Sequence, residues 1–312
     1  MTARPSRRPR PALLLAAVVI GVAIGLGLDI ARVGGLDAWF AVRGPHALPP
    51  DSPPYIARGR TVDVDGRAVY LDCRGSGSPT VILEAGFGAG AGSWAWLLDD
   101  TAEVTRVCAW DRPGLGRSEA RGLHTGLETA ADLRAALEAA GEEGPYVVVA
   151  HSLGGVYALL FASLQGPAAG AGVEAFVLLD TFEPLVWLAD EPGLDEAIRD
   201  SHREVLVRTG AMFQGGEQLH WEATLAELYA MGPTEVEALL LPTNMGSKFG
   251  DQAQPAPSAL AAAWYRVVDE LYPNGRVEIV ANSGHMIHFD QPDLVATRVR
   301  EVVAGVRARA GT

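Results

Sequence analysis

Apolar positions recur along this chain with two different periods, and the period changes repeatedly after Arg60. Residues 60–75 alternate apolar and polar in two runs around Asp65-Gly66, which predicts two strands joined by a hairpin turn. Short continuous apolar runs follow, typical of strands that are buried on both faces. These runs are TVILE, RVCAW, YVVVA, EAFVLL, VEALLL and RVEIVA.

Stretches with apolar residues at helical spacing separate these runs. The clearest are WAWLLDDTA, GLETAADLRAALEAA, GVYALLF, ALAAAWYRVVDELY and QPDLVATRVREVVAGVRA. Strands that alternate with helices predict an α/β fold with a mostly parallel sheet covered on both faces. The interval 184–233 breaks the alternation with helical pieces rich in acidic and aromatic residues. We expect it to form a small helical lid over the carboxyl ends of the strands, where ligands bind in open α/β sheets.

The first 58 residues have a different character from the rest of the chain. A basic arm, 1–11, precedes an uncharged apolar run, 12–28, which as a helix is roughly 25 Å long and reaches across a bilayer. The basic arm predicts that this end stays in the cytoplasm. No convincing cleavage site follows, so an uncleaved transmembrane anchor is favoured over a cleaved signal sequence. We expect residues 29–58 to form a proline-rich linker and 59–312 to form the globular domain.

This organisation predicts a membrane-anchored protein with its main domain outside the cytoplasm, or a secreted one if the leader is cleaved. Apolar residues make up 48% of the chain, enough for a large packed core. The formal net charge is −13, which disfavours nucleic acid as a partner. The two cysteines form no metal-binding motif with histidines, so we expect neither metal nor cofactor. The expected partners are a small-molecule substrate and, through the N-terminal helix, the membrane.

The stretch PYVVVAHSLGGVYALLF places a serine at the junction of a strand and a helix. A nucleophile at such a junction needs a tight turn that exposes its oxygen, with small residues two positions before and two after it. Here the turn is Ala150-His151-Ser152-Leu153-Gly154, with alanine where the pattern usually has glycine. The sequence therefore predicts that Ser152 is a nucleophile.

Four motifs occur in order: EAGFGAGAGSW, DRPGLGRS, AHSLGG and NSGHMIHFDQP. With them the chain, over about residues 60–310, resembles the α/β-hydrolase superfamily, which implies an eight-stranded sheet and a serine–acid–histidine triad in that chain order. In this resemblance Ser152 is the nucleophile and His285, after the last strand, is the base. His288 is the rival base. His151, beside the serine, is interpreted as a packing or pocket-lining residue.

The resemblance leaves the triad acid open. In most members the acid follows the seventh strand, but here no carboxylate follows Leu241 until Asp251. In some members, certain haloalkane dehalogenases among them, the acid follows the sixth strand, where Asp180 lies. Asp180 is therefore favoured, and Asp251 and Glu183 are the alternatives.

The family supplies two backbone N–H groups to the oxyanion hole, which correspond here to Phe87 and Leu153. The Asp111-Arg112 pair is expected to be buried and to fix its loop. In the family's topology the second and fourth strands are neighbours, which would let Cys73 and Cys108 form a disulfide in an exported protein.

The resemblance implies a serine hydrolase, like a carboxylesterase or lipase, that cleaves an ester or amide through an acyl-enzyme. The serine argues against the dehalogenase and epoxide hydrolase branches, whose nucleophile is aspartate. The alternatives are a non-catalytic binding module, suggested by the missing carboxylate after the seventh strand, and a cofactor-free lyase or peroxidase-like enzyme. Several apolar residues favour a hydrophobic substrate: Phe87, Trp94, Trp96, Trp187, Met212, Phe213 and Trp221.

Overall fold

The fold is taken from a computed structural model of the 312-residue chain. It describes residues 55–165, 172–188, 190–192, 196, 199, 200, 203, 217–243 and 259–311. The predicted arm 1–11, the predicted anchor 12–28, most of the linker 29–58 and Asp251 lie outside these residues. Among the described residues, no helix is both long and apolar enough to cross a membrane.

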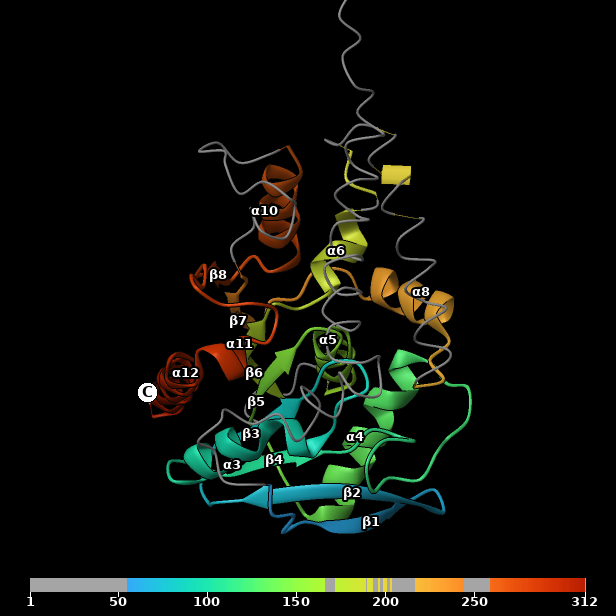
Figure 1. Ribbon diagram of the computed structural model, residues 1–312, viewed down its shortest axis with the longest axis vertical. Helices are drawn as coiled ribbons and strands as arrows, with labels where there is room; N and C mark the ends of the chain where they lie inside the picture. The colour runs from blue at the N-terminus through green and yellow to red at the C-terminus, as the bar shows by residue number, and fades with distance from the viewer. Residues whose placement is uncertain are drawn as a thin grey trace, which may run out of the picture.

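Eight strands form one sheet in the order β1-β2-β4-β3-β5-β6-β7-β8, shown in Figure 1. The first two pairings, β1 with β2 and β2 with β4, are antiparallel, and the others are parallel. This confirms the expected α/β-hydrolase sheet with a hairpin at its start. The strands are β1 (Arg60–Val64), β2 (Arg67–Arg74), β3 (Thr80–Glu84), β4 (Val107–Trp110), β5 (Tyr146–His151), β6 (Val173–Leu179), β7 (Glu237–Leu241) and β8 (Gly275–Val277).

The hairpin between β1 and β2 turns at the two residues that the sequence indicated. Asp65 has φ +52° and Gly66 has φ +77°, the pair of positive φ values that a tight two-residue hairpin turn needs. The last strand, in contrast, is shorter than the apolar run predicts. It ends at Val277, and Val280 forms only an isolated bridge, with Thr243.

The helices begin and end where local signals place them, as α4 illustrates. Thr125 caps this helix through the backbone N–H of Glu128, whose side chain bonds back to the cap, and Gly141 ends it in the left-handed conformation. The helices are η1 (Ala91–Trp94), α3 (Ala95–Ala102), α4 (Gly126–Ala140), α5 (Gly154–Gln165), α6 (Glu183–Leu188), α8 (Trp221–Met231), α10 (Ala259–Leu271), α11 (Ile287–Asp290) and α12 (Pro292–Ala310).

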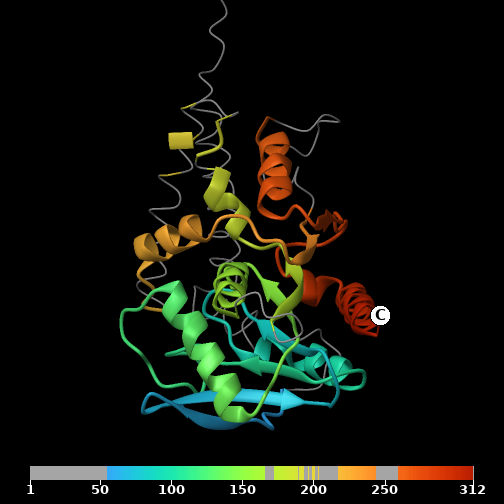
Figure 2. The same ribbon diagram turned by 180° about the vertical axis from the view of Figure 1, so that it is seen from behind.

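Two apolar clusters cover the two faces of the sheet. Because successive strand residues point to opposite faces, Val148 of β5 joins the cluster formed with α4, α5, α8 and α10, whereas Val147 and Val149 join the cluster formed with α3 and α12. In both views, α6, α8 and α10 lie at the end of the molecule opposite the β1–β2 hairpin (Figures 1 and 2). Helices α6 and α8 belong to the interval predicted as a lid, most of whose residues between them are not described.

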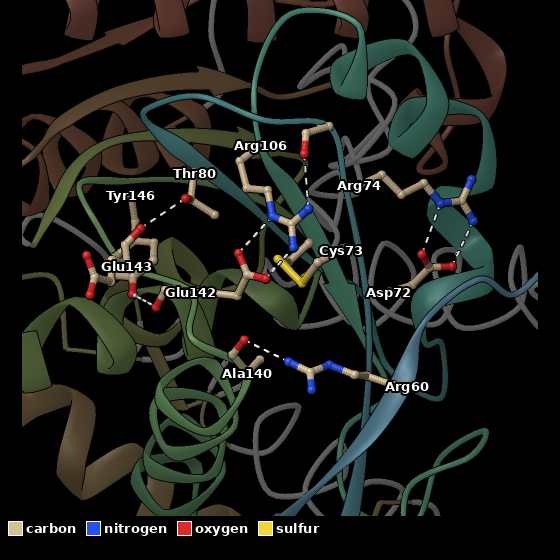
Figure 3. Close-up of a disulfide and its surroundings, with 12 residues drawn as sticks. Arg60, Asp72, Cys73, Arg74, Thr80, Arg106, Ala140, Glu142, Glu143 and Tyr146 are labelled. Atoms are coloured by element: carbon tan, nitrogen blue, oxygen red, sulfur yellow. Dashed lines mark hydrogen bonds and ion pairs between the residues drawn. A yellow bond between two sulfur atoms is a disulfide. The ribbon is translucent and has the colours of Figure 1, made fainter.

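Cys73 and Cys108 form a disulfide across the antiparallel pair β2 and β4, where they are directly opposite each other. Figure 3 shows Arg106 and Glu142 beside it, with the Arg106 Nε–H donating to a Glu142 carboxylate oxygen at 2.8 Å. The bridge links residues 35 positions apart and ties the antiparallel edge of the sheet to its parallel part.

Candidate active site

Ser152 lies in the tight turn between β5 and α5. Its φ is +53°, an uncommon value for a residue other than glycine and one that marks a strained turn. The turn is held by the Ser152 N–H, which donates to the Leu179 carbonyl at 3.2 Å. Gly154 permits the approach of β3, because a Cβ there would lie only 2.4 Å from the Glu84 carbonyl oxygen. The sequence therefore builds a turn that presents the serine oxygen above the sheet.

His285 lies in the loop that precedes α11, and its side chain contacts this serine. Its Nε2 lies 3.0 Å from the Ser152 Oγ, and its side chain is 46% exposed. The Nδ1 on the other side of the ring lies 2.7 Å from Asp180 Oδ2. Because a carboxylate can only accept, Nδ1 carries the hydrogen and Nε2 is left to accept the serine hydroxyl. The three side chains thus form one continuous hydrogen-bonded chain.

Asp180 follows β6 directly, and its side chain is buried. Its φ is +49°, and its Oδ1 accepts from the Thr243 N–H at 2.9 Å and from the Thr243 hydroxyl at 3.1 Å. Thr243 stands just after β7, the place where most relatives in the superfamily carry the acid. Here this place supplies two donors that hold the Asp180 carboxylate, a role that no sequence pattern predicted.

Neither of the other two acid candidates is seen to contact His285 in the described part of the chain. Asp251 lies outside the described residues. Glu183 is buried, and its Oε1 accepts hydrogen bonds from the hydroxyls of Thr181 at 2.8 Å and Tyr272 at 2.6 Å. Of the described candidates, the structure brings Asp180 to the histidine.

His288, the rival base, is fully buried against other rings and does not meet Ser152. Its ring centroid lies 4.7 Å from that of Trp94 and 4.6 Å from that of His151. Burial, helped by the neighbouring His285, lowers the pKa of His288 to about 3, so its imidazole is neutral.

His151 packs beside the same rings and contacts the loop of His285. Its Nε2 lies 2.9 Å from the His285 carbonyl oxygen, and since a carbonyl only accepts, this nitrogen donates. Burial lowers the pKa of His151 well below its ordinary value. The residue thus packs as the sequence suggested and also holds the backbone of the histidine that meets Ser152.

The glycine-rich loop after β3 runs beside Ser152. A Cβ on Gly86 would lie 2.8 Å from His151 Nδ1 and 3.3 Å from the Ser152 Cβ, so only glycine fits here without displacement. Phe87 comes next in this loop. Among the described residues the Leu153 N–H has no hydrogen-bond acceptor. Both backbone groups predicted for the oxyanion hole therefore belong to segments that adjoin Ser152.

Asp111 and Arg112 are both buried but do not pair with each other, so the expected ion pair is wrong. The two carboxylate oxygens of Asp111 accept from the backbone N–H groups of Ala91 at 2.8 Å and Arg117 at 2.9 Å. Arg112 instead pairs with Glu84 and Glu217. Neighbouring residues at the end of a strand point in different directions, so adjacency in the sequence does not make them partners.

The apolar residues near the site divide between core and surface. Trp94 and Trp221 are fully buried core residues, whereas Phe87, Trp96 and Trp187 are partly exposed. Met212 and Phe213 lie outside the described residues. Phe87 and Trp187 pack on the cluster that contains α5 and α8, and Trp96 packs on the opposite cluster.

Among the described side chains, one set of three has the spacing of metal ligands: Cys73, Cys108 and Glu142. Its two sulfur atoms are joined in the disulfide, so neither is available as a thiolate ligand.

Known proteins share this architecture. A model of the alpha/beta hydrolase family matches residues 81–298. The uncharacterized protein YqjL of Bacillus subtilis is 26% identical over 249 residues, which cover 78% of this chain and 91% of YqjL. Two solved structures share the fold at 18% identity. The epoxide hydrolase CorEH has a TM-score of 0.56, with 80% of this chain and 99% of its own covered. A serine hydrolase of Cycloclasticus zankles has a TM-score of 0.54, with 80% and 98% covered. The chain belongs to the alpha/beta hydrolase family.

Proposed function

We propose that this protein is a serine hydrolase that cleaves an ester or amide bond of a small hydrophobic molecule through an acyl-enzyme at Ser152. The observation that carries the proposal is the hydrogen-bonded series from Ser152 through His285 to Asp180, with distances of 3.0 and 2.7 Å. A serine hydroxyl is a weak nucleophile until a neighbouring base removes its proton. His285 is that base, and Asp180 holds it in the required tautomer.

The reaction follows from these positions. His285 Nε2 takes the proton of Ser152 as its Oγ attacks the substrate carbonyl carbon, and the carbonyl oxygen becomes an oxyanion. The N–H groups of Phe87 and Leu153 donate to that oxyanion. The imidazolium then protonates the leaving alcohol or amine, which departs and leaves an acyl group on Ser152. His285 next deprotonates a water molecule that attacks the ester, and collapse of the second oxyanion returns the proton to Ser152 and releases the acid.

The main reason for the alternative of a non-catalytic binding module was the missing carboxylate after β7. Asp180 bonded to His285 offers an acid from β6 and weakens that reason. Two residues support the proposal of a hydrophobic substrate. Phe87 and Trp187 are partly exposed apolar residues, on the glycine-rich loop and on α6 respectively. A carboxylesterase- or lipase-like activity fits both features.

The test uses the full-length protein in detergent with p-nitrophenyl butyrate. We expect a burst of nitrophenol equal to the enzyme concentration and, in acid-quenched samples, a butyryl mass on the peptide that contains Ser152. Ser152→Ala should abolish both. Steady ester turnover without an acyl adduct, undiminished in Ser152→Ala, would contradict an acyl-enzyme at Ser152. Absence of ester turnover in the folded wild type would contradict the hydrolase proposal and favour a lyase- or peroxidase-like use of His285.

We further propose that residues 12–28 anchor the protein in a membrane, or export it if cleaved, so that residues 59–312 act outside the cytoplasm. The Cys73–Cys108 disulfide supports this proposal, because such bonds persist in oxidising compartments. The protein should stay with membranes after an alkaline carbonate wash, or appear in the medium without its leader, and protease added to spheroplasts should degrade any anchored form. Recovery of the full-length chain in the cytosol would overturn the proposal.

A further inference from the structure

Arg112 is buried beside the glycine-rich loop, and all five of its N–H donors are in use. Its Nε–H donates to Glu217 at 3.0 Å, and one terminal nitrogen donates to the other oxygen of Glu217 at 2.6 Å. That same nitrogen donates to the Gly86 carbonyl at 2.6 Å. The second terminal nitrogen donates to Glu84 at 2.8 Å and to the Ala85 carbonyl at 2.7 Å. This guanidinium therefore fixes two successive carbonyl groups of the loop.

The bond to Gly86 has a consequence for the next residue. Gly86 C=O and Phe87 N–H belong to the same peptide group, which is planar and trans, so the two bonds point in opposite directions. Holding the carbonyl oxygen toward Arg112 therefore directs the Phe87 N–H away from Arg112. The adjoining Gly86 Cα lies close to Ser152, since a methyl group added there would approach the Ser152 Cβ to 3.3 Å. Arg112 thus sets the direction of an N–H group beside the nucleophile.

Glu217 also bonds to the loop, next to Arg112. Its Oε1 accepts the Gly88 N–H at 2.6 Å, and its Oε2 accepts the hydroxyl of Tyr157 at 3.0 Å. Tyr157 lies on α5, the helix that begins after Ser152, and its ring also faces the Arg112 guanidinium at 4.8 Å. Glu217 itself precedes α8, in the interval between β6 and β7. One carboxylate therefore joins that interval to the glycine loop and to the nucleophile's helix.

The charges of this cluster do not balance when both acids are ionised. One guanidinium faces two carboxylates, Glu84 and Glu217, and all three side chains are at most 2% exposed. A buried charge that loses its partner is costly, so each member depends on the other two. Such mutual dependence favours a single arrangement of the loop.

We propose that Arg112 and Glu217 are positioning residues that direct the Phe87 N–H into the oxyanion hole and couple it to the interval between β6 and β7. This proposal rests on the proposed hydrolase function. Neither side chain touches the substrate, because both are buried under the loop. Their effect is expected on the stabilisation of the transition state and not on ground-state binding.

The test compares Glu217→Gln with Glu227→Gln in the full-length protein. Glu227 is a matched control, since it lies on α8 and accepts a backbone N–H, that of Leu127 at 2.9 Å, which belongs to α4 and not to the glycine loop. Glutamine keeps the size of Glu217 but removes the charge that Arg112 faces and leaves one oxygen instead of two to accept. Two quantities are measured: kcat and KM per active site, counted by fluorophosphonate titration, and hydrogen exchange of the amides of residues 86–89.

Losing one oxyanion donor costs about 10²–10³ in rate, so a misdirected donor in Glu217→Gln should lower kcat by about 10-fold or more and leave KM within about twofold. Exchange at 86–89 should be faster than in the wild type. Glu227→Gln should change neither quantity. Arg112→Lys should match the Glu217→Gln defect if it folds, because lysine cannot make this five-donor set.

Equal kcat per active site in Glu217→Gln and Glu227→Gln would overturn the proposal, and so would unchanged exchange at 86–89. A wild-type protein without ester turnover or labelling would instead contradict the proposed function. In that case the exchange comparison alone decides whether Arg112 and Glu217 hold the loop.

Discussion

Replacing Asp180 by asparagine should lower kcat strongly, because Thr243 determines which way the asparagine amide is oriented. The variant keeps the shape of the side chain but replaces one carboxylate oxygen with an NH₂ group. Oδ1 faces two donors of Thr243, a backbone N–H at 2.9 Å and a hydroxyl at 3.1 Å. The N–H can only donate, so the amide oxygen must occupy the Oδ1 position. The NH₂ group then faces Nδ1 of His285.

That arrangement fixes the wrong tautomer of the histidine. An NH₂ group donates to Nδ1, so the imidazole hydrogen moves to Nε2, the atom that must accept the proton of Ser152. A tautomer error of this kind, with the geometry otherwise intact, lowers kcat by about 10³–10⁴-fold. The loss corresponds to roughly 4–5.5 kcal/mol of transition-state stabilisation.

The assay measures kcat for p-nitrophenyl butyrate at pH 8, together with thermal unfolding to confirm that the variant is folded. Asp251→Asn is the control, since Asp251 is the acid that the family pattern would otherwise supply, and it should retain kcat within about twofold. A folded Asp180→Asn protein with kcat within about tenfold of the wild type, or a large loss in Asp251→Asn, would refute this reasoning.

Three further changes test how the site is supported. Gly154→Ala should lower the melting temperature and kcat together, because its Cβ would lie 2.4 Å from the Glu84 carbonyl oxygen and 2.8 Å from that of Ala85, and differential scanning calorimetry checks the first effect. Burial, opposed by Arg112, raises the pKa of Glu84 to about 7 from 4.5. As the pH rises from about 4 to about 8, the free energy of unfolding of the wild type should therefore fall by on the order of 3 kcal/mol relative to that of Glu84→Gln. Urea unfolding measures both values, and a difference between the two proteins that does not change with pH would contradict this. Replacing Cys73 and Cys108 by alanine should lower the free energy of unfolding by about 2–4 kcal/mol, whereas an equal urea midpoint with and without the bond would show that it adds nothing.

Local signals were enough to predict most of this fold. The hairpin at Asp65-Gly66, the buried run before Ser152 and the helical spacing of α4 each depend on neighbours within a few positions. Motif order then placed Ser152 and His285, and the position after the sixth strand suggested Asp180. Each of these residues follows a strand, and the apolar run of that strand can be recognised in the sequence.

The supporting contacts escaped prediction because they join distant segments. Arg112 meets Glu217 across 105 positions, and Asp180 meets Thr243 across 63. No periodicity links such residues, so the sequence suggested only the neighbouring Asp111 as a partner for Arg112. The short β8 has a similar cause, because pairing with β7 and not apolar content decides where an edge strand ends.

The central claim is that Ser152 is an activated nucleophile, and fluorophosphonate labelling with peptide mapping tests it most directly. In the full-length protein we expect stoichiometric labelling of Ser152, with a rate that falls by about 10³-fold or more in Asp180→Asn, because the same base activates the serine toward phosphorus. Absence of label from Ser152 in the folded wild type, or equal labelling of the denatured chain, would contradict the account.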